Sequence, residues 1–462
     1  MSQSTPKSNN TDMTVGSPTK LILVFAIPLL IGNIFQQFYN VVDSIVVGNY
    51  VGSTALAAVG TAFPVIFMFT SLFMGIGIGA TIMIAQYYGA GDHDRVRRTV
   101  DTIYSSMMIG SVPLTIIGVL LSSTFLKLMQ VPDDTFADAY TYITIIFIGI
   151  LPTLGYNINA GILQGLGDSR SPLIFLSIAT GINIVLDLVF VLVFHWGVAG
   201  VAIATVIAQF SSWVFGILYI NKKYPNLNIN PFRFRFDKTL FVQSIKLGIP
   251  AGFQQAIFSL GIMMMQSLVN SYGSDFMAGY NGATKIDTFS FLPIQSFATS
   301  VTTFVGQNIG AGRMDRVKQG AKATLIMSIG CNLVLSVLLL LFSPLLMRMF
   351  SPSDPVIAAG MAYLYRILPF HWLLAILFVI NGVMRGAGEM IMPVISTTIS
   401  LLLARVPSAY LIAHYIGRDN IYFSFPIGWA LGLVLALTYY LSGRWKRKSI
   451  VNRSLNALDG TL

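Results

Sequence analysis

Long apolar blocks constrain the fold of this chain of 462 residues more than any other feature. Each block reaches the length of about 20 residues that a helix needs to cross a bilayer core. Only 10% of the residues are charged, against roughly 25% in soluble domains, so the chain lacks the polar surface of a soluble protein. We therefore predict an all-α polytopic membrane protein with about twelve transmembrane helices. The predicted spans are 21–46, 55–86, 99–125, 137–164, 172–194, 197–221, 240–269, 275–306, 320–349, 356–385, 392–415 and 423–443.

The 28 Lys and Arg residues are divided unevenly between the two sides of these spans. With a cytoplasmic N-terminus, 21 lie on the cytoplasmic side, three lie outside and four lie within spans. This is the positive-inside distribution, so the net charge of +10 orients the chain in a membrane and does not indicate a nucleic-acid partner. We expect a multi-pass protein of the bacterial cytoplasmic (inner) membrane with both termini in the cytoplasm.

The sequence contains no Walker phosphate-binding loop and no soluble stretch long enough for a nucleotide-binding domain. The single cysteine, Cys331, excludes a disulfide framework, and the four histidines lack the spacing of metal ligands. We therefore expect a chain that is not an enzyme, has no cofactor or resident metal and is not driven directly by ATP. Its expected partners are small molecules and membrane lipids, and we expect a monomer.

Short motifs recur at a constant shift of 221 residues. Gly-Ala-Gly-x-x-Asp-Arg-Val occurs at 89–96 and 310–317, Asn-x-x-Gly-Ser at 49–53 and 270–274, and Gly-x-Gly plus an acidic residue at 165–168 and 386–389. Six predicted spans separate equivalent points, so the halves share one orientation and a pseudo-two-fold axis along the membrane normal. We predict six-helix lobes at 21–221 and 240–443, a cytoplasmic linker at 222–239, and cytoplasmic tails at 1–20 and 444–462.

Three acidic residues, Asp43, Asp187 and Asp287, lie well inside predicted spans. A charge at that depth costs roughly 2.5–3.5 kcal/mol on insertion scales, so each needs a reason. The shift of 221 places Met264 opposite Asp43 and Ser408 opposite Asp187, so only the first half holds this pair. Two buried carboxyls suit proton exchange, whereas their oxygen atoms also suit Na⁺. A purely structural role, satisfying neighbouring hydroxyls and amides, is the alternative.

Polar residues on other predicted helices provide partners for these carboxyls. Asn183 lies four residues before Asp187 and therefore shares its helix face. We expect a polar pocket in the N-terminal lobe, and its members are Asp43, Asn157, Asn183, Asp187 and Thr205. The candidates for lining a substrate cavity are Gln37, Tyr39, Asn40, Gln254, Gln255, Lys285 and Asp287. For Lys285 and Asp287 a structural role is the equal alternative.

Several short motifs follow one another along nearly the whole chain, and their order is informative. They are Pro28, the segment from Tyr39 to Gly48, the segments 55–60, 86–91 and 164–172, Tyr156-Asn157, and the Asn183/Asp187 pair. By these motifs the chain resembles the multidrug and toxic compound extrusion (MATE) family, in its bacterial DinF/MepA-like branch. The resemblance implies a V-shaped two-lobe antiporter that exports cationic, amphipathic compounds against a H⁺ or Na⁺ gradient.

The resemblance also implies a cation site in the N-terminal lobe, on Asp43, Asn157, Asn183, Asp187 and Thr205. One departure concerns the second lobe. The glutamate typical of helix 7 in the NorM-like branch is absent, with Gln254 and Gln255 nearby, which argues against the C-lobe cation site of that branch. We predict H⁺ as the coupling ion and keep Na⁺ as the alternative.

Two other transporter classes remain as alternatives. A lipid-linked precursor flippase of the same superfamily would have a more basic cavity than spans holding only Lys246, Lys285, Arg366 and Arg405. A major-facilitator antiporter would have glycine four residues before the Asp of its Asp-Arg loop motif, where this chain has Ala90. A channel or membrane enzyme is disfavoured, because the sequence shows no filter motif, metal cluster or paired catalytic groups.

Overall fold

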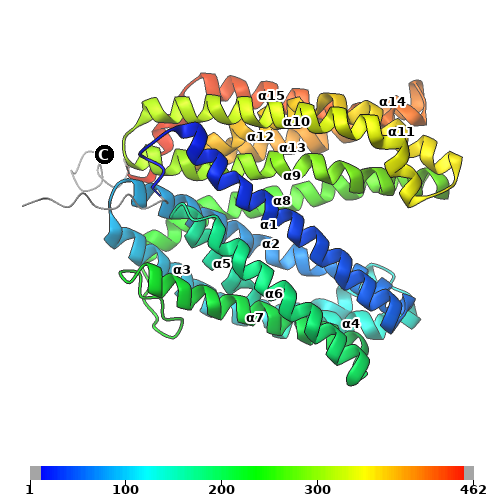
Figure 1. The fold of residues 1–462 in the computed structure, drawn as a ribbon, viewed down its shortest axis with the longest axis horizontal. Helices are drawn as coiled ribbons and strands as arrows, with labels where there is room; N and C mark the ends of the chain where they lie inside the picture. Colours follow the sequence, from blue (N-terminus) through cyan, green and yellow to red (C-terminus); the bar gives the residue numbers. More distant parts are fainter. Residues whose placement is uncertain (1–11, 452–462) are drawn as a thin grey trace, which may run out of the picture. The chain divides into compact units, whose positions relative to one another are not determined.

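The computed structural model describes residues 12–451, and this part of the chain is almost entirely helical and contains no strand (Figure 1). Residues 1–11 and 452–462, which include most of the predicted N-terminal tail and the second half of the basic tail, lie outside the described residues. The helices of the first repeat are α1 (Pro18–Val46), α2 (Ser53–Gly89), α3 (His93–Leu128), α4 (Asp133–Ile148), α5 (Ile150–Gly165), α6 (Arg170–Leu188) and α7 (Gly197–Lys223).

The second repeat has the same order of long helices, interrupted by more short helical segments. Its helices are α8 (Lys238–Asn270), α9 (Ser274–Gly310), α10 (Met314–Phe350), α11 (Asp354–Ile367), α12 (His371–Gly386), α13 (Ile391–Thr398), α14 (Val406–Tyr415) and α15 (Ser424–Leu441). The short π-helical segments are Val47–Val51, Val189–Val193 and Ile399–Arg405, and the short 3₁₀ segments are Leu368–Phe370, Arg418–Phe423 and Arg444–Lys448.

Ten helices of the described chain are long and apolar enough to cross a membrane, or eleven if α4 and α5, bent by 55°, form one span. The predicted span at 275–306 corresponds to α9, which is not among them. This helix of 37 residues carries Asn281, Lys285 and Asp287 in its first half, and its second half is mostly buried within the protein. The polytopic helical architecture is thus confirmed, and α9 depends on burial by its neighbours rather than on its own apolarity.

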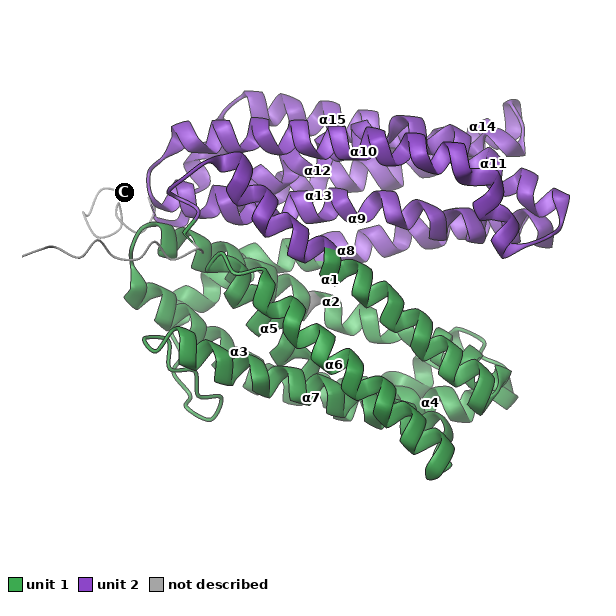
Figure 2. Ribbon diagram, viewed as in Figure 1, with its two compact units in different colours: residues 1–12, 31–252 green, residues 13–30, 253–462 purple. Residues whose placement is uncertain are grey.

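The described chain forms two compact units, coloured separately in Figure 2. Unit 1 contains Ile31–Gly252, and unit 2 contains Met13–Leu30 with the chain from Phe253 onward. These borders differ from the predicted lobes, which began at 21 and 240. Each unit includes the first part of a helix whose remainder belongs to the other unit, namely α8 in unit 1 and α1 in unit 2.

Close packing explains why the first part of α8 belongs to unit 1 and the first part of α1 belongs to unit 2. In unit 1, α8 crosses α2 so closely that a Cβ on Gly75 would lie 2.3 Å from the carbonyl oxygen of Gly248. In unit 2, the start of α1 contributes Ile22 and Phe25, both almost fully buried, to a cluster that includes Phe304 of α9. In unit 1, glycine residues allow two helix backbones to approach closely. In unit 2, large buried apolar side chains stabilise the packing of α1 instead.

Equivalent hydrogen bonds confirm the internal repeat. The hydroxyl of Thr81 in α2 lies 3.0 Å from the carbonyl oxygen of Gly161 in α5. The hydroxyl of Thr302 in α9 lies 3.0 Å from that of Gly382 in α12. Both pairs are related by the sequence shift, since 302 − 81 and 382 − 161 are each 221. The two repeats therefore share their helix packing as well as their motifs.

The recurring acidic residue of the repeat caps the next helix. Gly167 and Gly388 adopt φ of 87° and 89°, a left-handed conformation that glycine permits without strain. The residue after each glycine caps the next helix: Asp168 accepts hydrogen bonds from the first amides of α6, and Glu389 accepts hydrogen bonds from the first amides of α13. Each carboxylate also pairs with a lysine: Nζ of Lys223 lies 2.7 Å from Asp168, and Nζ of Lys448 lies 3.3 Å from Glu389.

These capping carboxylates lie outside the membrane-spanning helices and are held ionised. Burial opposes ionisation of Asp168, but bonds from Lys223 and Ser171 outweigh it and hold its pKa below the usual value. Burial likewise opposes ionisation of Glu389, but bonds from Tyr439, the amide of Met392 and Lys448 lower its pKa. Both residues therefore act as structural anions at equivalent positions of the repeat.

Candidate functional site

The carboxyls of Asp43 and Asp187 meet inside unit 1. Asp43 lies near the end of α1, and Asp187 lies near the end of α6, where its side chain is 1% exposed. The two carboxyls lie within electrostatic range of each other. The structure thus brings together the two acidic residues that the sequence places in separate helices, 144 residues apart (187 − 43).

The oxygen atoms at this meeting point lack donors. Among the described residues, none donates a hydrogen bond to either oxygen of Asp187, to Oδ1 of Asp43 or to Oδ1 of Asn183. Two ionised carboxylates can only accept hydrogen bonds, so a bond between them requires a proton on one of them. A hard cation bound by the same oxygen atoms would satisfy them as well. The geometry therefore suits one positive charge, either a proton or a metal cation, between the two carboxyls.

Hydroxyl groups from three helices surround the pair. The amide nitrogen of Asn183 lies 3.5 Å from the hydroxyl of Thr205 in α7. The hydroxyls of Tyr39 in α1 and Tyr142 in α4 also approach Thr205, and both tyrosines lie within electrostatic range of Asp43 and Asp187. Four of the five residues predicted for the polar pocket are thus gathered here, together with Tyr39, which was predicted to line the substrate cavity.

Asn157 is the predicted pocket member that the structure does not connect to this cluster. Its amide donates to the carbonyl oxygen of Thr153, one turn earlier in α5, at 2.8 Å. It lines a small apolar cavity of about 150 Å³ between α2, α3 and α5. Gln37 and Asn40 are exposed on α1, and no described contact joins them to the carboxyls. The roles assigned to these three residues stay predictions.

Unit 2 contains its own partly buried carboxylate, Asp287 of α9. The hydroxyl of Tyr363 in α11 donates to Oδ2 at 2.9 Å. On the other side, Nε2 of His371, at the start of α12, lies 3.1 Å from Oδ1. This approach is close enough for an ion pair but is not aligned for a hydrogen bond. Asp287 therefore holds two neighbouring helices together through a tyrosine and a histidine.

A chain of polar contacts continues beyond His371. Its Nδ1 lies 2.8 Å from the hydroxyl of Ser290, and that hydroxyl lies 3.2 Å from Oδ1 of Asn332 in α10. The amide nitrogen of Asn332 donates to the carbonyl oxygen of Ser328, which orients the Asn332 oxygen toward Ser290. If the single proton of Ser290 goes to Asn332, then His371 must donate from Nδ1. Asp287, His371, Ser290 and Asn332 thus form one network across three helices.

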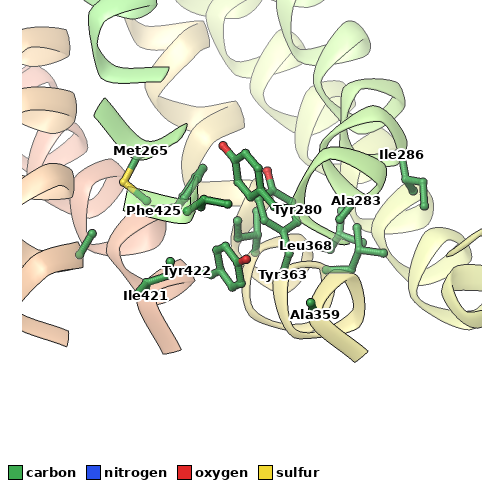
Figure 3. Close-up of a cluster of buried hydrophobic side chains, with 14 of the residues drawn as sticks. Met265, Tyr280, Ala283, Ile286, Ala359, Tyr363, Leu368, Ile421, Tyr422 and Phe425 are labelled. Atoms are coloured by element: carbon green, nitrogen blue, oxygen red, sulfur yellow. The ribbon is translucent and has the colours of Figure 1, made fainter. Parts of the chain in front are cut away.

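Tyrosines at equivalent positions serve the two carboxyl sites. Tyr142 of unit 1 and Tyr363 of unit 2 are separated by 221 residues (363 − 142), and each approaches the carboxyl group of its own unit. Around Tyr363 the rings of Tyr280 and Tyr422 pack at centroid distances of 5.5 and 5.1 Å (Figure 3). The tyrosine therefore occupies equivalent positions in the two repeats, but the carboxyl groups that it approaches lie on helices that are not equivalent.

Other predicted residues of unit 2 have different surroundings. Both hydrogen atoms of the Gln254 amide have partners in α13, since Nε2 lies 2.7 Å from the hydroxyl of Thr397 and 3.2 Å from the carbonyl oxygen of Pro393. Gln255 is half-buried, and Lys285 is exposed on α9. Gln254 thus contributes to packing between α8 and α13, and the cavity-lining roles of these residues stay predictions.

Reasoning from sequence missed His371 and Tyr363. The four histidines were dismissed because their spacing along the chain fits no metal site. The sequence did carry a signal for Tyr363, because the shift of 221 pairs it with Tyr142. No comparable signal marked His371, whose equivalent is the apolar Ile150. Among the described residues no group of three or more His, Cys, Asp and Glu side chains is arranged to hold a metal ion.

A repeated bundle of membrane-spanning helices with buried carboxyls is the architecture of a secondary transporter. Comparison with known proteins agrees with this class. The sequence model of the MatE family matches residues 28–189 and 250–411, once in each repeat. The chain therefore belongs to the MatE family, a family of multidrug efflux transporters.

Individual relatives extend over the whole chain. It is 31% identical over 439 residues to the probable multidrug resistance protein YpnP of Bacillus subtilis, covering 94% of this chain and 97% of the relative. It is 26% identical over 453 residues to the probable multidrug resistance protein NorM of Thermotoga maritima, covering 94% of each. A crystal structure of MATE in complex with MaL6 has the same fold, with a TM-score of 0.87, 24% identity and coverage of 97% of this chain and 100% of that one.

Proposed function

We propose that this chain is an antiporter that exports cationic or amphipathic compounds in exchange for protons by alternating access. It would reside in the bacterial cytoplasmic membrane with both termini in the cytoplasm, as the distribution of Lys and Arg indicates. Its relatives are described as probable multidrug resistance proteins, which supports export of varied small molecules. The coupling site of the proposal is the Asp43/Asp187 pair.

One observation carries the choice of coupling chemistry. The carboxyls of Asp43 and Asp187 lie within electrostatic range of each other, and no donor from the described residues reaches either oxygen of Asp187. Adjacent buried carboxyls cannot both stay ionised at low cost, so the pair alternates between a state with one shared proton and a state without it. Protonation changes the charge of the pair, and the electrostatic free energy of the surrounding packing changes with it.

Protonation then biases the transporter between its two facing states. A proton entering from outside stabilises the state in which the two carboxyls lie in contact. Loss of that proton to the cytoplasm favours a state in which they separate or take up another cation. The membrane potential contributes about 2.3 kcal/mol per charge per 100 mV, so inward proton movement can drive export.

Na⁺ is the alternative coupling ion for the same site. The oxygen atoms of Asp43, Asp187, Asn183 and Thr205 are hard ligands of the kind that such cations prefer. The preference for H⁺ rests on the closeness of the two buried carboxyls, because two such groups cannot both stay ionised at low cost and one of them then takes up a proton.

Transport by inverted vesicles tests the proposal. Vesicles acidified inside should accumulate a cationic dye such as ethidium when only a pH gradient is imposed, and collapse of that gradient should release the dye. Vesicles that contain the Asp43→Asn variant provide the matched background. Dye accumulation that needs a Na⁺ gradient, or that is equal in the variant and the natural chain, would contradict the proposal.

A further inference from the structure

The linker between α7 and α8 presents three phenylalanines to its surroundings. Its sequence at 232–236 is Phe-Arg-Phe-Arg-Phe, preceded by Pro231. Phe232, Phe234 and Phe236 are 80%, 60% and 53% exposed. By contrast, Leu227 and Ile229 earlier in the same linker are buried, so the linker as a whole packs on unit 1. Three large apolar side chains nevertheless remain uncovered within five residues.

The backbone beneath these phenylalanines is fixed to α3. The amide and carbonyl of Arg235 both bond the hydroxyl of Ser105 at 3.0 Å, and the amide of Asp237 donates to the hydroxyl of Thr102 at 3.2 Å. Asn221 at the end of α7 makes two further bonds with the backbone of Ile229. The exposed rings are therefore held at a defined height along α3.

That height corresponds to the edge of the membrane. The first turns of α3 contain the charged cluster that ends at Asp101, and the next charged residue along the helix is Lys127. Thr102 and Ser105, which hold the linker, are therefore the first residues of the uncharged stretch. Aromatic side chains are enriched at this depth, where they contact both acyl chains and headgroups. Exposure of Phe234 and Phe236 here is exposure to lipid at the interface.

Basic side chains lie beside the rings. Arg233 is exposed, and Nη1 of Arg235 lies 3.6 Å from Asp101. A surface cavity of about 520 Å³ adjoins Phe236, and its charged lining consists of Arg97, Arg98, Arg235 and Lys238 together with Asp94, Asp101 and Asp237. Of these, Arg98 is paired with Asp237 and Arg235 with Asp101. The segments 92–101 and 222–238 together contain eight Lys and Arg residues and four Asp residues, an excess of four positive charges (8 − 4).

We propose that the linker segment 231–238 is an interfacial anchor that binds anionic phospholipid in the adjoining leaflet. Phe232, Phe234 and Phe236 insert among the acyl chains near the headgroups. Arg233 and the basic groups of the cavity bind the lipid phosphates. The ligand is thus an anionic phospholipid of the bilayer that already surrounds α7 and α8, and this binding site is independent of the coupling ion.

The other repeat shows that the phenylalanines are not needed to fix such a segment. Residues 13–16 precede α1 as the linker precedes α8, and Arg316 donates to the carbonyl oxygens of Met13 and Gly16 at 3.2 and 2.9 Å. The corresponding residues 12–16, Asp-Met-Thr-Val-Gly, contain no aromatic side chain; Met13 is buried and Val15 is exposed. The phenylalanines of the linker are therefore not needed to fix its backbone, which supports lipid contact as their function.

Spin-label depth measurements on the full chain in lipid vesicles test the apolar part of the anchor. Cys331 is the only cysteine, so Cys331→Ser gives a background in which Phe234→Cys can be labelled alone. We expect this label to be more accessible to oxygen than to a water-soluble nickel complex. Asn226→Cys, an exposed position of the same linker, provides the control and should show the reverse. Equal nickel accessibility at both positions, or a label at 234 shielded from both reagents by protein contact, would overturn the proposal.

Lipid retention tests the charged part. The purified chain should retain phosphatidylglycerol through detergent extraction, and Arg233→Gln should lower that amount about fivefold, the effect of one basic residue at an anionic surface. Lys127→Gln, an exposed residue at the other end of α3, serves as the control and should retain the lipid. Equal retention by both variants and the natural chain would contradict the assignment of Arg233.

Discussion

Asp43 of α1 and Asp187 of α6 lie within electrostatic range of each other in unit 1, and among the described residues no donor reaches either oxygen of Asp187. Most buried polar atoms in proteins have hydrogen-bond partners, and an ionised carboxylate without one is especially costly. A carboxyl pair selected only for packing would be replaced at lower cost by amides, which carry their own donors. These oxygen atoms without donors support the proposal that a mobile cation binds at this position.

Replacing Asp43 by asparagine should abolish coupled efflux while leaving the protein folded. Asparagine has nearly the same shape but carries no exchangeable proton at this position, so the change separates charge from packing. Dye efflux by vesicles with the variant should fall to the rate of vesicles without the protein. Asp133→Asn, at an exposed position in the first turn of α4, should transport at the normal rate. Normal transport by Asp43→Asn would remove this residue from the coupling site.

The Asp187→Asn variant should be at least as stable as the natural chain and yet lose coupling. The new amide can donate to the carboxylate of Asp43, and this hydrogen bond, worth about 1 kcal/mol, does not depend on a shared proton. Thermal unfolding in detergent measures the stability, and the vesicle assay measures coupling. A variant that unfolds at much lower temperature would show instead that the Asp187 carboxylate is needed for packing.

Replacing Asp287 by asparagine should change substrate preference more than ion coupling. Asp287 lies in the unit without the carboxyl pair, and a partly exposed carboxylate there favours cationic substrates. The double variant with His371→Gln should reveal an interaction energy between these residues of about 0.5–3 kcal/mol in thermal unfolding. Efflux of a cationic dye and of a neutral one measures the preference. Loss of all response to the ion gradient in Asp287→Asn would assign coupling to unit 2 as well.

Acid should destabilise the chain partly through Glu389. Its folded-state pKa lies below the ordinary value of 4.5, so its contribution is fully present above that value. The contribution is lost as the pH falls through the lower folded-state pKa. Thermal unfolding of Glu389→Gln should show less stability at neutral pH, by about 1–2 kcal/mol, and a flatter decline between pH 5 and pH 3. Asp419→Asn, at an exposed residue, should follow the natural chain, and an unchanged acid decline in Glu389→Gln would contradict the role of Glu389.

The sequence singled out Asp43 and Asp187, the proposed coupling pair, because the cost of burying a charge and the internal repeat point to the same residues. A carboxylate within an apolar span is expensive, and the shift of 221 showed that only the first half carried two of them. The same shift revealed the two repeats and placed acidic residues at the equivalent positions 168 and 389, although it did not predict that they cap helices. These features are local in sequence or fixed by the repeat, and so they could be read without coordinates.

Features that depend on packing between distant helices could not be read in this way. The His371 network joins α9, α10 and α12, and no spacing along the chain reveals that contact. Asn157 shares the polar character of the pocket, but its amide bonds its own helix. The exchange of the first parts of α1 and α8 between units follows from close contacts such as Gly75 with Gly248, which hydropathy does not detect.

Efflux measured without Na⁺ tests the central claim most directly. Vesicles containing the natural chain would be kept at a fixed pH on each side of the membrane, so that a constant proton gradient is maintained. All Na⁺ would be replaced by choline. The proposed pair of Asp43 and Asp187 predicts export at the full rate under these conditions, and loss of export when the proton gradient is collapsed. Export that stops in choline and returns when Na⁺ is added would show that the carboxyl pair binds Na⁺ and would contradict proton coupling.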